Sequence, residues 1–192
     1  MLALGSELIK MPVMSLHTGG RIANLQKPII NPVNLRILAY SLKEVILAED
    51  SSLLRTDEIR EVSSLGVIID SADDFIGIDD VIKIKEVSDL GFRLVSMPVV
   101  DERGHKLGKV SDYAVDTATF MIQKLYVKKA GFRSLTDTGM LIDRSQVIEI
   151  NHSVIIVKSA SEQVKSEPAQ IEPVYDYINP FRKPAQTLQP DN

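Results

Sequence analysis

The stretch that decides the fold is Asp101–Asp116, which reads DERGHKLGKVSDYAVD. It follows the apolar pair Val99–Val100 and carries a polar turn before a second apolar run, so it predicts strand, turn and strand. Gly104 supplies the positive φ that such a turn needs. Gly108, inside the second strand, indicates a bulge or a close approach of two backbones. The stretch is neither a P-loop, which needs Lys followed by Ser or Thr at a helix start, nor an EF-hand, whose carboxylate spacing is different.

The chain repeats itself at an offset of 85 to 88 residues. Matching segments follow one another in the same order at nearly constant spacing, which predicts an internal duplication. The matches are Met11–Val13 with Met97–Val99, Gly20–Leu25 with His105–Val110, Ile30–Pro32 with Val115–Thr117, Leu54–Val62 with Ile142–Ile150, and Val67–Ile69 with Ile155–Val157.

Each copy is rich in short Val, Ile and Leu runs separated by turn residues, which is typical of a small barrel or sandwich. A barrel suits a small unit because its closure removes exposed edge strands. The expected strands are Leu35–Leu42, Val45–Ala48, Ile59–Val62 and Val67–Ile69 in the first copy, and Gln123–Val127, Met140–Ile142, Val147–Ile150 and Val154–Val157 in the second. Pro28 and Pro32 cannot donate to a ladder, so their strand should lie at an edge or carry a bulge.

The segment between the copies, Asp79–Gly91, has apolar residues at helical spacing, with Asp79 as the expected cap and Gly91 at the C-terminal end. A strand is the alternative, because Val81–Lys85 also alternates in part. The tail holds five of the nine prolines and predicts a flexible segment. The predicted organisation is barrel copy 1 at 8–75, a helical linker at 76–92, barrel copy 2 at 93–158 and a flexible tail at 159–192.

The residues of the opening stretch resemble the hallmark of the PRC-barrel family, the small β-barrel shared by the photosynthetic reaction centre H subunit and a ribosome-maturation factor. The resemblance is carried by Asp101, Gly104, Lys106, Leu107, Gly108, Lys109, Val110, Asp112 and Asp116. It implies an all-β protein of two tandem barrels, and it implies that the motif chiefly shapes turns. In the first copy the motif is degraded, because Ala23, Asn24 and Asn31 stand where the second copy has Gly108, Lys109 and Asp116.

Charge is distributed unevenly along a chain whose net charge is only −4. The span 103–133 has seven Lys or Arg against two acids, and the span 44–92 has thirteen acids against four Lys or Arg. The first span predicts a face for an anionic partner, made by Arg103, Lys106, Lys109, Lys124, Lys128, Lys129 and Arg133, with Tyr113, Phe120, Tyr126 and Phe132 as stacking surfaces. The alternative is a solvated outer barrel face with those aromatic rings in the core.

Catalysis and metal binding have little support in the sequence. The three histidines, His17, His105 and His152, lack zinc-ligand spacing, and no nucleophile elbow or dinucleotide fingerprint occurs. The pairs Asp73–Asp74 and Asp79–Asp80 suit a solvated linker and a helix cap better than a metal site. The chain has no cysteine, which excludes disulfides and thiolate sites. We therefore expect no enzymatic activity, no cofactor and no metal.

The expected function is that of a non-enzymatic adaptor or assembly module in the cytoplasm. The resemblance makes RNA processing or ribosome maturation the first specific hypothesis, with a protein partner expected and RNA or the ribosome as a second. The alternatives are a peripheral subunit of a membrane electron-transfer complex and a scaffold that acts through its tail. For the last, the expected docking residues are Tyr175, Tyr177, Phe181 and Arg182. No run is apolar enough for an integral membrane segment, and the sequence leaves the oligomeric state open.

Overall fold

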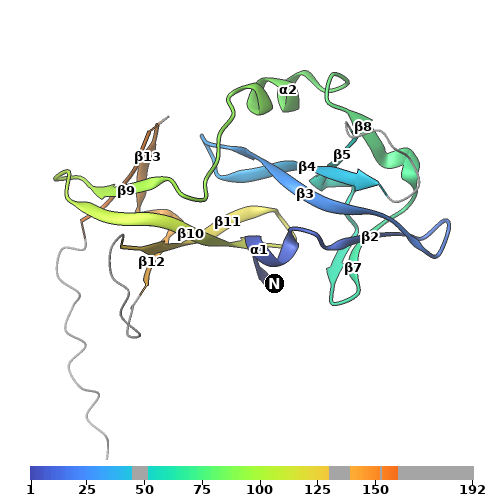
Figure 1. The fold of residues 1–192 in the computed structure, drawn as a ribbon, viewed down its shortest axis with the longest axis horizontal. Coiled ribbons are helices and arrows are strands. Elements are labelled where there is room, and N and C mark those ends of the chain that lie inside the picture. Colours follow the sequence, from blue (N-terminus) through green and yellow to red (C-terminus); the bar gives the residue numbers. More distant parts are fainter. Residues whose placement is uncertain (45–51, 130–138, 152, 160–192) are drawn as a thin grey trace, which may run out of the picture. The chain divides into compact units, whose positions relative to one another are not determined.

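The computed structural model describes residues 1–44, 52–129, 139–151 and 153–159, all within one unit, Met1–Ser159 (Figure 1). The fold is mainly β, as predicted. The first half, residues 1–77, contains β1 (Leu2–Leu4), α1 (Gly5–Leu8), β2 (Pro12–Ser15), β3 (Arg21–Asn31), β4 (Arg36–Glu44), β5 (Ser52–Arg55), η1 (Thr56–Glu58), β6 (Glu61–Ser63), β7 (Gly66–Ile69), η2 (Ala72–Asp74) and β8 (Phe75–Gly77). The second half, residues 82–157, contains α2 (Ile82–Asp89), β9 (Pro98–Asp101), β10 (Lys106–Asp116), β11 (Met121–Lys128), β12 (Met140–Asp143), η3 (Arg144–Gln146), β13 (Val147–Ile150) and β14 (Ile155–Val157).

The main strand pairings of the two halves correspond, whereas the pairs β1–β10 and β5–β8 have no counterpart among the described residues. β2 pairs antiparallel with β3 and parallel with β7, and β9 pairs antiparallel with β10 and parallel with β14. Antiparallel pairing then continues from β3 to β4 to β5, and from β10 to β11 to β12. The strands form an open sheet in the order β13-β14-β9-β10-β11-β4-β3-β2-β7-β6. Outward from the central pair of β11 and β4, the strands of the two halves follow one another in the same order.

Unusual backbone conformations recur at matched positions. Lys10 and Ser96 have φ of 72° and 75°, and Leu35 and Phe120 have φ of 54° and 53°. Residues other than glycine rarely adopt this region. Its occurrence at the same two places in each half shows that the halves share local geometry as well as strand order.

The halves meet where β4 lies beside β11, through a reciprocal pair of hydrogen bonds. The Ile37 amide donates to the Phe120 carbonyl at 2.9 Å, and the Ile122 amide donates to the Leu35 carbonyl at 2.9 Å. Next to this pair the rings of Tyr40 and Phe120 meet edge to face at 6.5 Å. The contact is therefore approximately two-fold symmetric within one chain.

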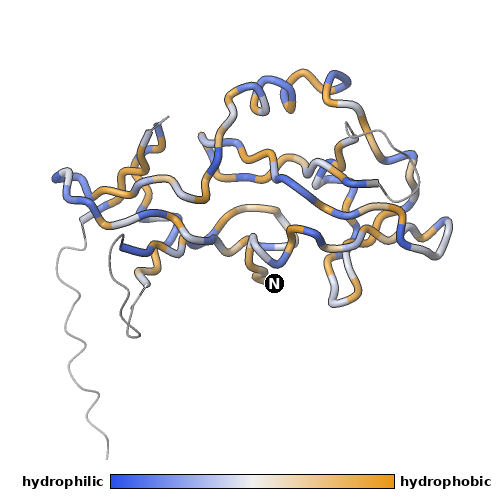
Figure 2. The backbone as a smooth tube through the Cα atoms, viewed as in Figure 1, coloured by the Kyte–Doolittle hydropathy of each residue, from blue (hydrophilic) through white to orange (hydrophobic). Residues whose placement is uncertain are grey.

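One hydrophobic cluster spans both halves. It includes Leu25 and Tyr40 from the first half and Ile122 and Leu125 from the second, each no more than 1% exposed. Burial of such side chains supplies most of the favourable free energy of folding. Along the tube in Figure 2, apolar stretches follow the strands and the turn between β9 and β10 is hydrophilic. Neither half encloses its core alone.

The segment predicted to be helical contains α2, which confirms the helix over the strand alternative. Gly91 follows the helix with φ of 59°, as expected for a C-terminal glycine. The predicted cap is wrong: Val81 occupies the N-cap position without a side-chain bond, and Asp79 instead pairs with Lys85. Lys85 can reach back to Asp79 because both side chains are exposed.

Most expected strands lie within one or two residues of observed ones. Pro28 lies inside β3, beside a register shift between Leu25 and Pro28, so the predicted bulge is confirmed. Pro32 follows the end of β3 and is therefore not part of the strand. The strand expected at Val45–Ala48 lies outside the described residues. The strand before it, β4, ends at Glu44.

Candidate functional site

Asp101 organises the turn after β9. Its carboxylate accepts hydrogen bonds from the Arg103 amide at 2.9 Å and the His105 amide at 2.8 Å, and it lies 2.9 Å from the His105 Nδ1. Desolvation raises the pKa of Asp101, but the hydrogen bonds from His105 and Arg103 outweigh it, so the pKa lies below its ordinary value. The Asp101 carboxylate therefore stabilises the turn through these contacts.

Both glycines of the opening stretch have positive φ, 82° at Gly104 and 147° at Gly108. A Cβ on Gly108 would lie 2.3 Å from the carbonyl oxygen of Lys128, whereas a Cβ on Gly104 would meet nothing within 4 Å. A register shift between Lys106 and Gly108 places the bulge where the sequence predicted it. Gly108 therefore permits the close approach of β10 and β11.

The other two motif aspartates anchor the start of the chain. Asp112 accepts hydrogen bonds from the Ser6 amide at 3.2 Å and the Ser6 hydroxyl at 2.5 Å. Asp116 accepts from the Thr119 hydroxyl at 2.7 Å and lies 3.4 Å from the N-terminal amine of Met1. The Thr119 hydrogen bond, with that of the Ala118 amide, lowers the pKa of Asp116. These contacts hold β1 and α1 against β10.

The cations of the predicted basic face are solvent-accessible wherever they are described. Lys109 and Lys128 stand directly opposite each other on β10 and β11. The remaining described members are Arg103, Lys106, Lys124 and Lys129, and Arg133 lies outside the described residues. The structure therefore brings Lys109 and Lys128 together on adjacent strands of the second half.

The stacking role predicted for Tyr113 and Phe120 is wrong. They are 2% and 3% exposed, because both side chains belong to the shared core. Tyr126 is 37% exposed and remains available, and Phe132 lies outside the described residues. The alternative, in which the aromatic rings lie in the core, is correct for the two buried residues.

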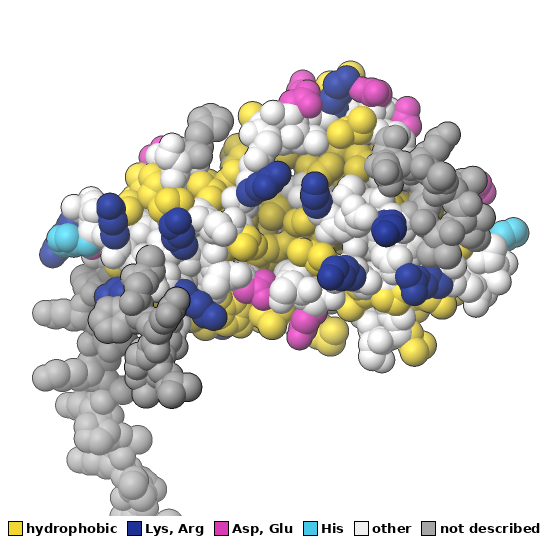
Figure 3. Space-filling view, in the orientation of Figure 1, with side chains coloured by type: hydrophobic (Ala, Val, Ile, Leu, Met, Phe, Trp, Pro, Cys, Tyr) yellow, Lys and Arg dark blue, Asp and Glu magenta, His cyan; other side chains and the backbone are white. Residues whose placement is uncertain are grey.

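A groove that the sequence did not reveal lies between β3 and the segment that joins α2 to β9. Its volume is about 510 Å³, and its floor includes Pro28, Ile29 and Leu94. Figure 3 shows a hollow of hydrophobic side chains at the centre of this face with Lys and Arg around it. A neighbouring depression of about 570 Å³ shares Ile9 and Lys27 with the groove. We call the two together the central groove.

The rim of the central groove is entirely cationic among its charged residues. Its lining includes no Asp or Glu, and its cations are Lys10, Arg21, Lys27, Lys43 and Arg93. Each of the five side chains is exposed, and none forms an ion pair with another described residue. In a chain with a net charge of −4, this arrangement concentrates positive potential over an apolar floor.

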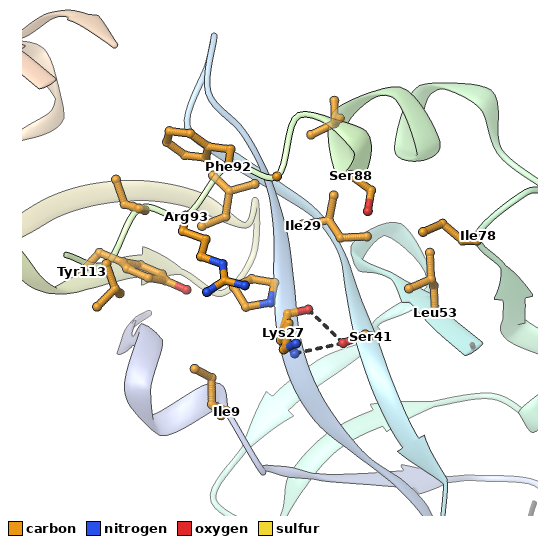
Figure 4. Close-up of a pocket in the computed structure, with 16 residues that line it drawn as sticks. Ile9, Lys27, Ile29, Ser41, Leu53, Ile78, Ser88, Phe92, Arg93 and Tyr113 are labelled. Atoms are coloured by element: carbon orange, nitrogen blue, oxygen red, sulfur yellow. Dashed lines mark hydrogen bonds between the residues drawn. The ribbon is translucent and has the colours of Figure 1, made fainter. Parts of the chain in front are cut away.

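A buried hydroxyl group lies at one end of the central groove. Tyr113 lines it, and its hydroxyl oxygen is buried with no hydrogen-bond partner among the described residues. Figure 4 shows this hydroxyl directed toward the side chain of Arg93, with Lys27 on β3. Burial raises the pKa of Tyr113, so the hydroxyl is a neutral donor at physiological pH. An acceptor group in the groove would satisfy it.

The remaining sequence-derived candidates gain no site. Among the residues that the structure describes, no group of three or more His, Asp or Glu is arranged to hold a metal ion. Within the same ranges, no helix has the length and apolar character needed to cross a membrane. The Asp74 carboxylate accepts a hydrogen bond from the amide of Ser71, the N-cap of η2, and the Asp80 carboxylate accepts one from the Gly77 amide. The tail residues Tyr175, Tyr177, Phe181 and Arg182 lie outside the described part of the chain.

One signal in the sequence points to the central groove. At the repeat offset of 85, Lys27 corresponds to Asp112, and at 86, Arg93 corresponds to Glu7. A reversal of charge at matched positions marks a surface on which the two halves differ. Comparison of the copies by charge, rather than by similarity alone, would have found it.

The family model of the PRC-barrel domain matches residues 86–164, which covers α2 from Glu86 onward and all strands of the second half. No curated protein matches the chain.

Proposed function

We propose that this protein, whose residues 86–164 match the family model of the PRC-barrel domain, is a non-enzymatic adaptor that binds a protein partner through the central groove. The observation that carries the proposal is an apolar floor surrounded by five cations with no acid in the lining. Apolar contact supplies affinity at an interface, and charge complementarity supplies selectivity. The favoured partner is therefore a protein segment with apolar and acidic side chains.

The proposal includes a tandem arrangement, in which residues 8–75 are a second, diverged PRC barrel. The matched strand pairings and the matched positive-φ residues support it. In this arrangement the groove exists only because two copies are joined, since its lining comes from both halves. A single barrel would lack one wall of the site.

The test compares two charge-reversal variants in the full chain. Lys27→Glu with Arg93→Glu reverses the groove rim, and Lys106→Glu with Lys109→Glu reverses an equal number of exposed cations on the basic face. Partners captured from cell extract by wild type are quantified for both variants, with thermal unfolding as the folding control. We expect capture of at least one protein to be lost in the first variant and retained in the second. Equal capture by all three proteins would refute the groove as the adaptor site.

A second candidate function is RNA or ribosome binding through the basic face. The observation that favours it is the pair Lys109 and Lys128, placed directly opposite on adjacent strands. Like charges in that position destabilise a sheet, so a binding role would account for their presence. Co-sedimentation with ribosomal subunits over a salt series tests it. Binding that weakens with salt and is lost in the Lys106→Glu, Lys109→Glu variant would support it.

A further inference from the structure

The central groove occupies the place in the first half that β1 fills in the second. Leu2, Ala3 and Leu4 of β1 pair antiparallel with Asp116, Val115 and Ala114 of β10. The corresponding part of β3 is Ile29–Asn31, since both stretches precede the matched residues Leu35 and Phe120. Ile29 and Ile30 line the groove, and among the described residues this part of β3 pairs only with β4.

The chain itself explains why the position is open. The residues that correspond to β1 are Ser88–Leu90, at an offset of 86, and they form the last turn and cap of α2 instead of a strand. α2 packs Ile84 against Ala39 and Leu53, it also contacts β3, and its residues Val87 and Ser88 form one wall of the central groove. The backbone edge of β3 is therefore left without the strand that its counterpart holds.

The polar contacts that hold β1 are also replaced in the first half. Asp112, which accepts two hydrogen bonds from Ser6, corresponds to Lys27. Glu7, whose carboxylate accepts from the Leu4 amide, corresponds to Arg93. The anchoring positions thus change from anionic to cationic, so the first half cannot hold a second copy of β1 by the same contacts.

We infer that the central groove receives an extended peptide of a protein partner, which adds to β3 antiparallel and presents a carboxylate to Lys27 and Arg93. This inference rests on the proposed adaptor function and names the mode of binding. β1 runs from Asp116 toward Ala114, so a peptide in the matching place on β3 ends near Pro28 and Lys27. The carboxylate of the peptide would lie beside Lys27 and Arg93 and near the Tyr113 hydroxyl.

The ladder of backbone hydrogen bonds between the peptide and β3 is short. Thr117 donates its amide to the Met1 carbonyl at 2.9 Å, but Pro32 stands at the corresponding position and has no amide hydrogen. Backbone pairing is therefore confined to about three residues around Ile30. Apolar side chains on the peptide must supply the rest of the affinity, as in other cases of strand addition.

The experiment titrates synthetic peptides into full-length, isotope-labelled protein and follows the backbone amides by NMR. The probe is the hexapeptide Gly-Gly-Leu-Ala-Leu-Glu with a free C-terminus, whose apolar part copies β1. Two further peptides carry a single carboxylate each. One ends in Gln with a free C-terminus, and the other ends in Glu with an amidated C-terminus. A fourth has Gln and an amidated terminus, and a fifth has N-methyl alanine, which blocks the ladder.

We expect the probe to shift the amides of Ile29, Ile30 and Asn31 and to slow their hydrogen exchange. The fourth and fifth peptides should each bind at least about tenfold more weakly, as should the probe to the Lys27→Glu, Arg93→Glu variant. The second and third peptides identify whether a terminal or a side-chain carboxylate is preferred. Either preference agrees with the inference.

Several outcomes would overturn the inference. If millimolar probe leaves Ile29–Asn31 unshifted, or the N-methylated peptide binds equally well, the strand-addition mode is wrong. The adaptor function would survive either result, provided that Lys27→Glu with Arg93→Glu still abolishes partner capture. If the probe binds only after Tyr175, Tyr177 and Phe181 are changed to Ser, the occupant is the chain's own tail. If it binds only below the concentration of self-association, the occupant is a second copy.

Discussion

The long strand β3 pairs with β2 and β4 as β10 pairs with β9 and β11, but the surroundings of the two strands differ. β10 is covered by β1, which is fastened by Asp112 and Asp116, whereas β3 borders an open groove with Lys27 and Arg93 at its rim. The contrast teaches that one backbone plan can serve stability in one half and leave a free edge in the other. In the second half the carboxylates of Asp112 and Asp116 are engaged in internal hydrogen bonds, whereas Lys27 and Arg93 form no ion pair with another described residue.

The largest expected effect on the free energy of unfolding is at the β-bulge that both halves share. Ala23 occupies in β3 the place that Gly108 occupies in β10, and both bulges show the same register shift. Gly108→Ala should lower the free energy of unfolding by about 3 kcal/mol, because a Cβ at φ of 147° would also collide with the Lys128 carbonyl. Urea denaturation measures the loss.

Gly104→Ala is the matched control for this prediction. Its φ is also positive, but a Cβ there meets no atom within 4 Å, so we expect a loss of about 1 kcal/mol. Equal losses for the two variants would show that backbone conformation alone, and not the approach of β11, requires Gly108.

A smaller effect is expected where the charges of the halves are reversed. Asp112→Ala removes both hydrogen bonds to Ser6 and should lower the free energy of unfolding by about 1.5 kcal/mol. The amide of Ala3, paired with Val115, should also exchange faster with solvent. Hydrogen exchange and urea denaturation measure the two effects.

Lys27→Ala tests the same position in the first half. Lys27 is exposed and belongs to no ion pair among the described residues, so the free energy of unfolding should change by no more than about 0.5 kcal/mol. A loss as large as that of Asp112→Ala would mean that Lys27 has a structural role, and the contrast between the halves would fail.

The sequence predicted what depends on local pattern. Short runs rich in Val, Ile and Leu between turn residues identified most strands, the glycines of Asp101–Asp116 identified the turn and the bulge, and helical spacing identified α2. Each of these features is determined by residues close to one another in the chain, so the pattern is legible without knowledge of the fold.

The central groove could not be predicted in this way, because its walls come from distant parts of the chain. Ser6 meets Asp112 across 106 residues, and Ile9, Lys27 and Arg93 meet only after both halves have packed together. The sequence also left open whether Tyr113 lies on a surface or in the core, and the structure packs its ring against Gly5, where a Cβ would lie 2.3 Å from the ring. Alternation along β10 cannot reveal that both of its sides are covered.

The smallest expected effect concerns pH and the turn that follows the first strand of each series. Asp101 caps this turn in the second half, and the Ser15 hydroxyl accepts from the Thr18 amide at 3.3 Å in the first. Since the folded-state pKa of Asp101 is lowered, its stabilising contribution is complete above its unfolded pKa of about 3.9. The contribution is lost as the pH falls through the lower, folded-state value.

Asp101→Ser converts one turn into the other and isolates this contribution. The variant should be less stable than wild type at pH 7, and the difference in urea midpoint should shrink as the pH is lowered from 5 toward 3. Ser15→Ala is the control, because it removes a cap that does not titrate, and its cost should not depend on pH. A difference for Asp101→Ser that stays constant down to pH 3 would mean that the charge of the Asp101 carboxylate contributes nothing to the stability of the turn.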